Sequence, residues 1–131
     1  VFAHAGQGDK RSVIASLQLA EKYSNIYLDL SALKRPFLID EYGNEVPEGE
    51  EDSVEGYDPD LGQITYVLQQ IKDRGLIDRA FFATDGPQYS GMLKSYLTAF
   101  IKGIQKVGFS KEEIEKLLYR NADELYLKKA N

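Results

Sequence analysis

One histidine and one aspartate stand where the sequence could support catalytic chemistry. His4 lies at the end of the apolar run 1–5, and Asp85 follows the apolar run 80–83 directly before a Gly-Pro pair. An apolar run closed by turn residues is typical of a strand buried in a parallel sheet. The carboxyl ends of parallel strands meet at one edge of the sheet, where α/β enzymes build their active sites. We therefore expect His4 and Asp85 to share one rim.

An imidazole and a carboxylate on the same rim indicate a metal site. Histidine nitrogen and carboxylate oxygen are normal ligands of zinc, the first choice here, and also of manganese or iron. Asp85 could also take a proton from metal-bound water. Catalytic zinc uses three protein ligands, and the sequence holds no second histidine. A plainer interpretation of each residue stays open: His4 as a structural imidazole and Asp85 as a turn aspartate bonded to its own backbone.

Asp29 and Ser31 form a second pair of candidate residues. They close the run 26–31, which is β-branched and aromatic at its start and therefore predicts a strand. We expect both side chains on the same rim, as substrate contacts or as supports of the following loop.

The elements that must position these residues alternate between strand and helix. Alternation of this kind predicts an α/β fold with right-handed βαβ units and a parallel sheet. Strands are predicted at 1–5, 26–31 and 80–85, and helices around the apolar sets Val13/Leu17/Ala20, Leu61/Ile64/Leu68/Ile71, Leu93/Tyr96/Leu97/Phe100/Ile101/Ile104 and Ile114/Leu117/Leu118, with a short last helix capped by Asn121. Gly75 and Gly108 are expected to end the second and third helices. Ser110 and Glu113 form a capping box at the start of the fourth, where Glu112 can pair with Lys116.

Composition restricts the class of protein. The 131 residues fit one domain, 43% of them are hydrophobic, and there is no cysteine, which excludes disulfides and thiolate metal sites and predicts a reducing, cytoplasmic location. No apolar run approaches the roughly 18 residues that cross a bilayer, so no membrane partner is expected. Basic residues form no stripe with interleaved aromatics, so no nucleic-acid partner is expected either.

The acidity of the chain is concentrated in one segment. The net charge is −5, yet ten acidic residues and no Lys or Arg lie between Asp40 and Asp60. Periodicity is lost over about 34–60, which predicts an acidic loop insertion in a single domain 1–131. The segment could be a solvated insertion or a loop pinned by a short hairpin near 42–44. A calcium site and a loop that recruits a basic partner to a non-catalytic α/β module are the alternatives for its role.

Four motifs in order resemble the C-terminal part of the amidohydrolase superfamily, of the amidohydrolase-2 type that includes decarboxylases. These motifs are His-Ala-Gly at 4–6, Asn-Ile-Tyr-Leu-Asp-Leu-Ser at 25–31, Phe-Ala-Thr-Asp-Gly-Pro at 82–87, and Asn-Ala with Leu-Tyr at 121–126. The resemblance covers nearly the whole chain except the acidic loop. It implies about three βα units of a (β/α)₈ barrel with one or two divalent metals at its rim, acting on a small-molecule substrate.

The resemblance also assigns roles to residues. His4 matches the sixth-strand histidine, a metal ligand or catalytic group, and Asp85 matches the eighth-strand aspartate, a metal ligand and general base. The first-strand His-x-His pair, the fourth-strand group and the fifth-strand histidine of the family have no counterpart here and would lie upstream of Val1. Gly86 also stands where the family often has a larger residue. We therefore expect a segment that is inactive alone and pairs with itself or with a complementary N-terminal barrel segment.

Overall fold

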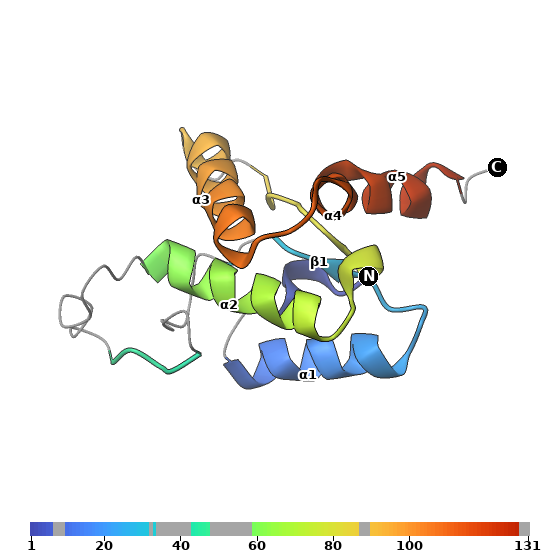
Figure 1. Ribbon diagram of the computed structural model, residues 1–131, viewed down its shortest axis with the longest axis horizontal. Helices are drawn as coiled ribbons and strands as arrows, with labels where there is room; N and C mark the ends of the chain where they lie inside the picture. Colours follow the sequence, from blue (N-terminus) through green and yellow to red (C-terminus); the bar gives the residue numbers. More distant parts are fainter. Residues whose placement is uncertain (7–9, 32, 34–42, 48–58, 87–89, 129–131) are drawn as a thin grey trace.

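The computed structural model describes residues 1–6, 10–31, 33, 43–47, 59–86 and 90–128. The described part is a mixed α/β structure that contains much more helix than strand (Figure 1). In chain order its elements are the 3-10 helix η1 (Ala3–Gly6), α1 (Lys10–Lys22), β1 (Leu28–Asp29), α2 (Pro59–Asp73), the 3-10 helix η3 (Ile77–Arg79), β2 (Ala80–Phe81), α3 (Met92–Val107), α4 (Lys111–Glu115), the π-helix η4 (Lys116–Arg120) and α5 (Asn121–Tyr126).

A short parallel sheet connects the two halves of the chain. In β1 and β2, Leu28 pairs with Ala80 and Asp29 pairs with Phe81. Phe2 adds a single parallel bridge to Leu28 on the other side of β1. The three segments therefore lie side by side in sequence order, with α1 and then α2 in the connections between them. This is the βαβ order that the alternating sequence pattern predicts.

The strands are much shorter than the sequence suggests. Only Phe2 of the predicted strand 1–5 pairs with the sheet, because the chain turns into η1 directly after it. The other two predicted strands are reduced to β1 and β2, and residues 82–86 have no regular secondary structure. At Phe82 the backbone N–H donates to the carbonyl oxygen of Leu117 at 2.7 Å. A helical partner there takes the place of a strand, so the ladder ends.

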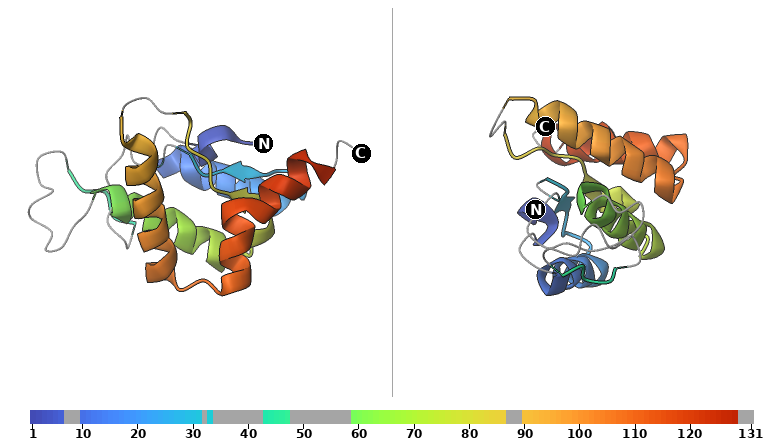
Figure 2. Two further views of the ribbon diagram at one scale, coloured as in Figure 1. Left: turned by 90° about the horizontal axis from the view of Figure 1, so that it is seen from above. Right: turned by 90° about the vertical axis from the view of Figure 1, so that its left-hand side faces the viewer.

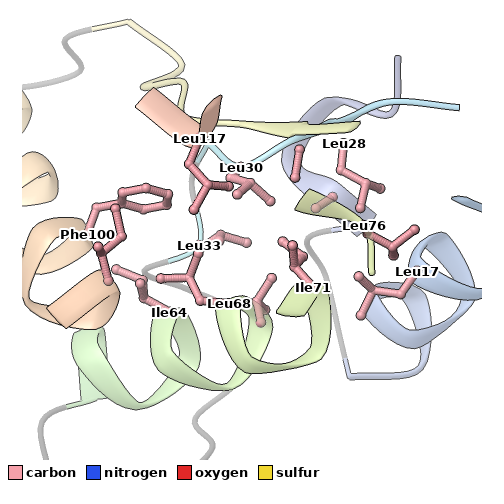
Figure 3. Packing of buried hydrophobic residues seen from close by; sticks show 14 of the residues in the cluster. Leu17, Leu28, Leu30, Leu33, Ile64, Leu68, Ile71, Leu76, Phe100 and Leu117 are labelled. Carbon is pink, nitrogen blue, oxygen red and sulfur yellow. The ribbon is translucent and has the colours of Figure 1, made fainter. Parts of the chain in front are cut away.

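The core lies between the sheet and the first three α-helices. Figure 3 shows Leu28 and Leu30 from the β1 segment among leucine and isoleucine side chains of α1 and α2, with Phe100 of α3 and Leu117 at the other end. Six of the seven apolar positions that the 3.6-residue periodicity predicts in α1 and α2 are buried, namely Val13, Leu17, Ala20, Ile64, Leu68 and Ile71. The seventh, Leu61, is half-buried, and Val67 is buried without having been predicted. In Figure 1, α2 crosses between α1 and α3.

The contact between α2 and α3 depends on a glycine. A Cβ atom placed on Gly103 would lie 2.8 Å from Cγ2 of Ile64 and 3.1 Å from Cδ1 of Leu68. Both distances are shorter than ordinary carbon–carbon contacts, so the absent side chain lets the two helices approach closely. This contact fixes α3, which carries Tyr96 toward the sheet.

The predicted helix ends are confirmed. Gly75 and Gly108 follow α2 and α3 with φ of +65° and +77°, the left-handed conformation that ends many helices. Ser110 and Glu113 form the predicted capping box before α4, since each side chain accepts a hydrogen bond from the other residue's backbone N–H. Glu112 also pairs with Lys116, at 3.3 Å, as the sequence spacing predicts.

The predicted Asn121 cap is wrong, and most of the predicted acidic loop is not described by the structure. Asn121 does not cap α5, because its amide points to the sheet edge and donates to the carbonyl oxygens of Ile77 and Ala80, at 2.6 and 2.8 Å. Most of the predicted acidic loop, residues 34–42 and 48–58, lies outside the described residues, and so does the first residue of the predicted hairpin at 42–44. At the other end, α2 already begins at Pro59, inside the predicted loop. In the described part of the chain, no helix combines the length and apolar character that crossing a membrane requires.

Candidate functional site

The pairing register brings the candidate residues to one end of the sheet. Phe2, Leu28 and Ala80 lie level across three parallel segments. His4 is two residues beyond this level, and Asp85 is five residues beyond it. Because the segments are parallel, the chain passes through both positions after leaving the same edge of the sheet. The common rim of the His4 and Asp85 side chains stays a prediction.

The exact placement of His4 and Asp85 corrects the prediction that each ends a strand. His4 belongs to η1, one turn of 3-10 helix, and not to the sheet. Asp85 lies four residues beyond Phe81, the last residue of β2, and its side chain is exposed. An exposed carboxylate carries little of the desolvation cost that a buried acid at the end of a strand would have.

The backbone is strained next to His4 and at Asp85. Ala5, directly after His4, has a φ of 44°, and Asp85 has a φ of 57°. They are the two non-glycine residues with positive φ in the described part of the chain. Left-handed backbone costs a non-glycine residue on the order of 1–3 kcal/mol and concentrates at functional sites. Aspartate tolerates this conformation better than alanine does.

The Ala5 conformation is held by α1. The Oγ atom of Ser16 donates to the carbonyl oxygen of Ala5 at 2.6 Å, and both residues are buried. A buried hydrogen bond of this kind fixes the backbone at the point where the chain leaves η1. The turn that carries His4 is therefore anchored to the first helix.

Asp29 and Ser31 form a local turn after β1. The Oδ1 atom of Asp29 accepts a hydrogen bond from the backbone N–H of Ser31 at 2.8 Å. Asp29 is half-buried and Ser31 is buried. Asp29 and Ser31 are expected either to contact substrate or to support the following loop, and this hydrogen bond serves the second role. Because Leu28 and Leu30 enter the helix-covered core, strand alternation places Asp29 on the opposite face, with its neighbour Phe81.

Tyr96 of α3 completes this turn, a role that the sequence does not indicate. Its hydroxyl donates to the carbonyl oxygen of Leu30 and accepts from the backbone N–H of Leu33 at 3.4 Å. Its ring stacks on Phe82 with a centroid distance of 5.6 Å. The helical periodicity identifies Tyr96 as a core position, but it contains no signal for the partner of the hydroxyl.

The surroundings of Tyr96 suppress its ionisation. Burial is the largest cause that raises the pKa of its phenol, and the negative charge of Asp29 raises it further, while the backbone N–H of Leu33 opposes both. Tyr96 therefore acts here as a neutral hydrogen-bonding group. It connects α3 to the two segments that leave the carboxyl end of the sheet.

The described residues do not make a metal site by themselves. No three His, Cys, Asp or Glu side chains come together within the described ranges. Asp85 has the right chemistry for a divalent cation, but one exposed carboxylate is not a coordination shell. A cation at this rim would need ligands beyond those that the described residues bring together.

Comparisons with known proteins found no similar family. No family model matches the chain, and no curated protein and no solved structure does so.

Proposed function

We propose that this chain supplies the rim of a metal-dependent hydrolase, or of a related decarboxylase, that acts on a small molecule. The register of the sheet is the observation that supports the proposal. Phe2, Leu28 and Ala80 lie level in three parallel segments, in sequence order, and His4, Asp29 and Asp85 each come after that level in their own segment. This is the order that three consecutive units of a (β/α)₈ barrel have.

In this proposal Asp85 performs proton transfer and contributes to metal binding. Its exposed carboxylate can accept a proton from a water molecule. The left-handed backbone at Asp85 changes the direction of the chain directly before Gly86. His4 has the role of second ligand or catalytic group, as the resemblance implies. Asp29 and Ser31 shape the neighbouring loop, which would contact the substrate.

The divalent cation, zinc by first choice and manganese or iron as alternatives, would supply a Lewis acid at this rim. The remaining ligands would come from a complementary N-terminal barrel segment. This requirement follows from the described residues, which gather no three potential ligands. The chain alone is therefore expected to bind a cation weakly and to show no turnover.

Zinc binding to the purified chain and its variants tests the role of Asp85. We expect Asp85→Asn to weaken zinc binding at least tenfold in calorimetric titration, because the variant loses an anionic ligand. Asp73→Asn is the matched control. Asp73 is also exposed, but it lies at the end of α2 that faces away from the rim, where it accepts from Gln69 at 2.7 Å. Circular dichroism spectra should show both variants folded.

Equal zinc affinity in Asp85→Asn, Asp73→Asn and the unchanged chain would contradict the proposal. The chain would then be better described as a non-catalytic α/β interaction or assembly module, the alternative that the acidic segment first suggested. A loss of zinc binding in both variants would indicate nonspecific attraction of cations to an acidic protein, which also contradicts a site at Asp85.

A further inference from the structure

One side of α3 exposes leucine side chains that the core does not use. The buried side of this helix carries Met92, Tyr96, Phe100, Gly103 and Ile104. Leu93 and Leu97 lie beside this buried surface, yet they are 46% and 42% exposed. In the right-hand view of Figure 2, α3 (orange) lies along the outside of the molecule above α2. The apolar surface of α3 therefore continues past the core onto the exterior.

The exposed leucines belong to a row. Leu93, Leu97 and Ile101 are spaced by four residues, so they follow one another along one line of the helix. Ile101 is half-buried and closes the row at its far end. The row spans about 12 Å of the helix axis, at about 1.5 Å per residue. Single exposed leucines are common on protein surfaces, but an aligned row is typical of a contact surface.

A basic row runs beside the apolar row. Lys94 and Lys102 each follow a member of the apolar row by one residue, and Lys106 continues their line by one more turn. Thr98 fills the remaining position between the first two lysines. The helix contains these three lysines and no acidic residue, although the whole chain has a net charge of −5. The surface is thus apolar along one line and positive along the next.

We propose that this face of α3 docks an acidic amphipathic helix of another protein. Apolar side chains of that helix would lie on Leu93, Leu97 and Ile101, and its carboxylates would meet Lys94 and Lys102. The charge complementarity selects an acidic partner, since like charges placed opposite each other oppose docking. The four-residue spacing suits a helix, whose own side chains repeat at three and four residues.

The size of the surface sets the strength of this interaction. A contact a little over two helical turns long buries much less area than a standard protein–protein interface. We therefore expect a weak, reversible complex with a dissociation constant in the micromolar range, and one whose affinity falls as salt concentration rises. An interaction of this kind concerns the outside of the protein and does not depend on the chemistry proposed for Asp85.

A synthetic peptide serves as the probe. It would have 18 residues, with leucine at three- and four-residue spacing and glutamate at most other positions, and a fluorescent label for anisotropy titration against the 131-residue chain. We expect Leu97→Ser to weaken binding about tenfold, and Lys102→Gln to weaken it about threefold and to reduce its salt dependence. Leu19→Ser is the matched control, since Leu19 is 38% exposed on α1, and it should bind like the unchanged chain.

Four outcomes would overturn the proposal. Unchanged peptide binding in both Leu97→Ser and Lys102→Gln would mean that α3 is not the surface. Equal binding of a peptide with lysine in place of glutamate would show apolar adhesion without charge selection. In sedimentation, a dimer of the chain that Leu97→Ser dissociates would assign the surface to a second copy. Binding to phosphatidylserine vesicles that Leu97→Ser abolishes, without peptide binding, would assign it to a lipid surface.

Discussion

The two ends of the short sheet are held together by different kinds of interaction. At the amino end, charged and amide side chains donate to backbone carbonyl groups. Nη1 of Arg79 donates to the carbonyl oxygens of Ala20 and Tyr23 at the end of α1, and Asn121 donates to those of Ile77 and Ala80. These hydrogen bonds join segments that are 41 to 59 residues apart in the sequence. The amino end of the sheet is therefore stabilised by hydrogen bonds between segments that are far apart in the sequence.

At the carboxyl end the hydrogen bonds come from hydroxyl groups, and the backbone is strained at two described residues. Hydroxyl groups of Tyr96 and Ser16 hold the turns after β1 and η1. Both described non-glycine residues with positive φ, Ala5 and Asp85, lie at this end. The carboxyl end of parallel sheets is where α/β proteins place function, while the amino end contributes stability. The comparison suggests the same division here, and variants at each end can test it.

The largest effect is expected at the amino end, from Asn121→Leu. The change removes two donors from a buried side chain and leaves the carbonyl groups of Ile77 and Ala80 without them. We expect the free energy of unfolding to fall by about 3 kcal/mol, measured by urea denaturation. Asn25→Leu, in an exposed turn, is the control and should change it by less than about 0.5 kcal/mol. If both variants lose similar free energy of unfolding, the hydrogen bonds of Asn121 do not stabilise the amino end.

A smaller loss is expected from Arg79→Leu at the same end. The variant lacks the guanidinium that donates to two carbonyl groups at the end of α1, one of them 2.8 Å away. Hydrogen bonds from a charged donor are worth more than neutral ones, so we expect a loss of about 2 kcal/mol in the same assay. Arg11→Leu, which removes an exposed arginine from the first turn of α1, should have little effect. Equal stability of the two variants would contradict the assigned role of Arg79.

The comparison also shows what the sequence could predict. The apolar periodicity of α1 and α2, the glycines after α2 and α3 and the Ser110–Glu113 capping box are local signals, and the structure confirms them. The predicted strands are longer than the observed ones, because an apolar run such as 80–83 indicates burial but not how many residues pair with a neighbouring strand. Ladder length depends on which neighbour is present, and at Phe82 that neighbour is Leu117 of a π-helix. The sequence of the strand does not indicate that a helix distant in the sequence will be its neighbour.

The sequence predicts the parallel order of the segments but not the contacts around the candidate residues. Parallel order follows from the alternation of elements, and the register of β1 and β2 confirms it, whereas the common rim of His4 and Asp85 stays a prediction. The roles of Tyr96 and Asn121 were missed because each polar group finds its partner 41 to 66 residues away. The exposure of Leu93 and Leu97 was missed as well, since periodicity assigns a helix an apolar side without saying how much of it a core covers.

The smallest effect is expected at the carboxyl end, from Tyr96→Phe. The variant keeps the stack on Phe82 and loses only the hydroxyl that joins Leu30 and Leu33, so we expect a loss of about 1 kcal/mol at pH 7. The contribution of Tyr96 to stability depends on pH, unlike those expected for Asn121 and Arg79. Because burial raises the pKa of Tyr96 above its ordinary value of 10.0, the unfolded chain ionises first as pH rises. The stability associated with neutral Tyr96 is therefore present below pH 10 and is lost at higher pH.

Urea denaturation between pH 9 and pH 11 measures this loss. The folded state keeps a proton that the unfolded state releases, which lowers the free energy of unfolding by up to about 1.4 kcal/mol per pH unit above pH 10. Tyr96→Phe removes this contribution, so its stability should decline less steeply with pH than that of the unchanged chain. Tyr23→Phe, at an exposed position, should leave the slope as it is. Parallel curves for all three proteins would mean that Tyr96 is not buried against the rim.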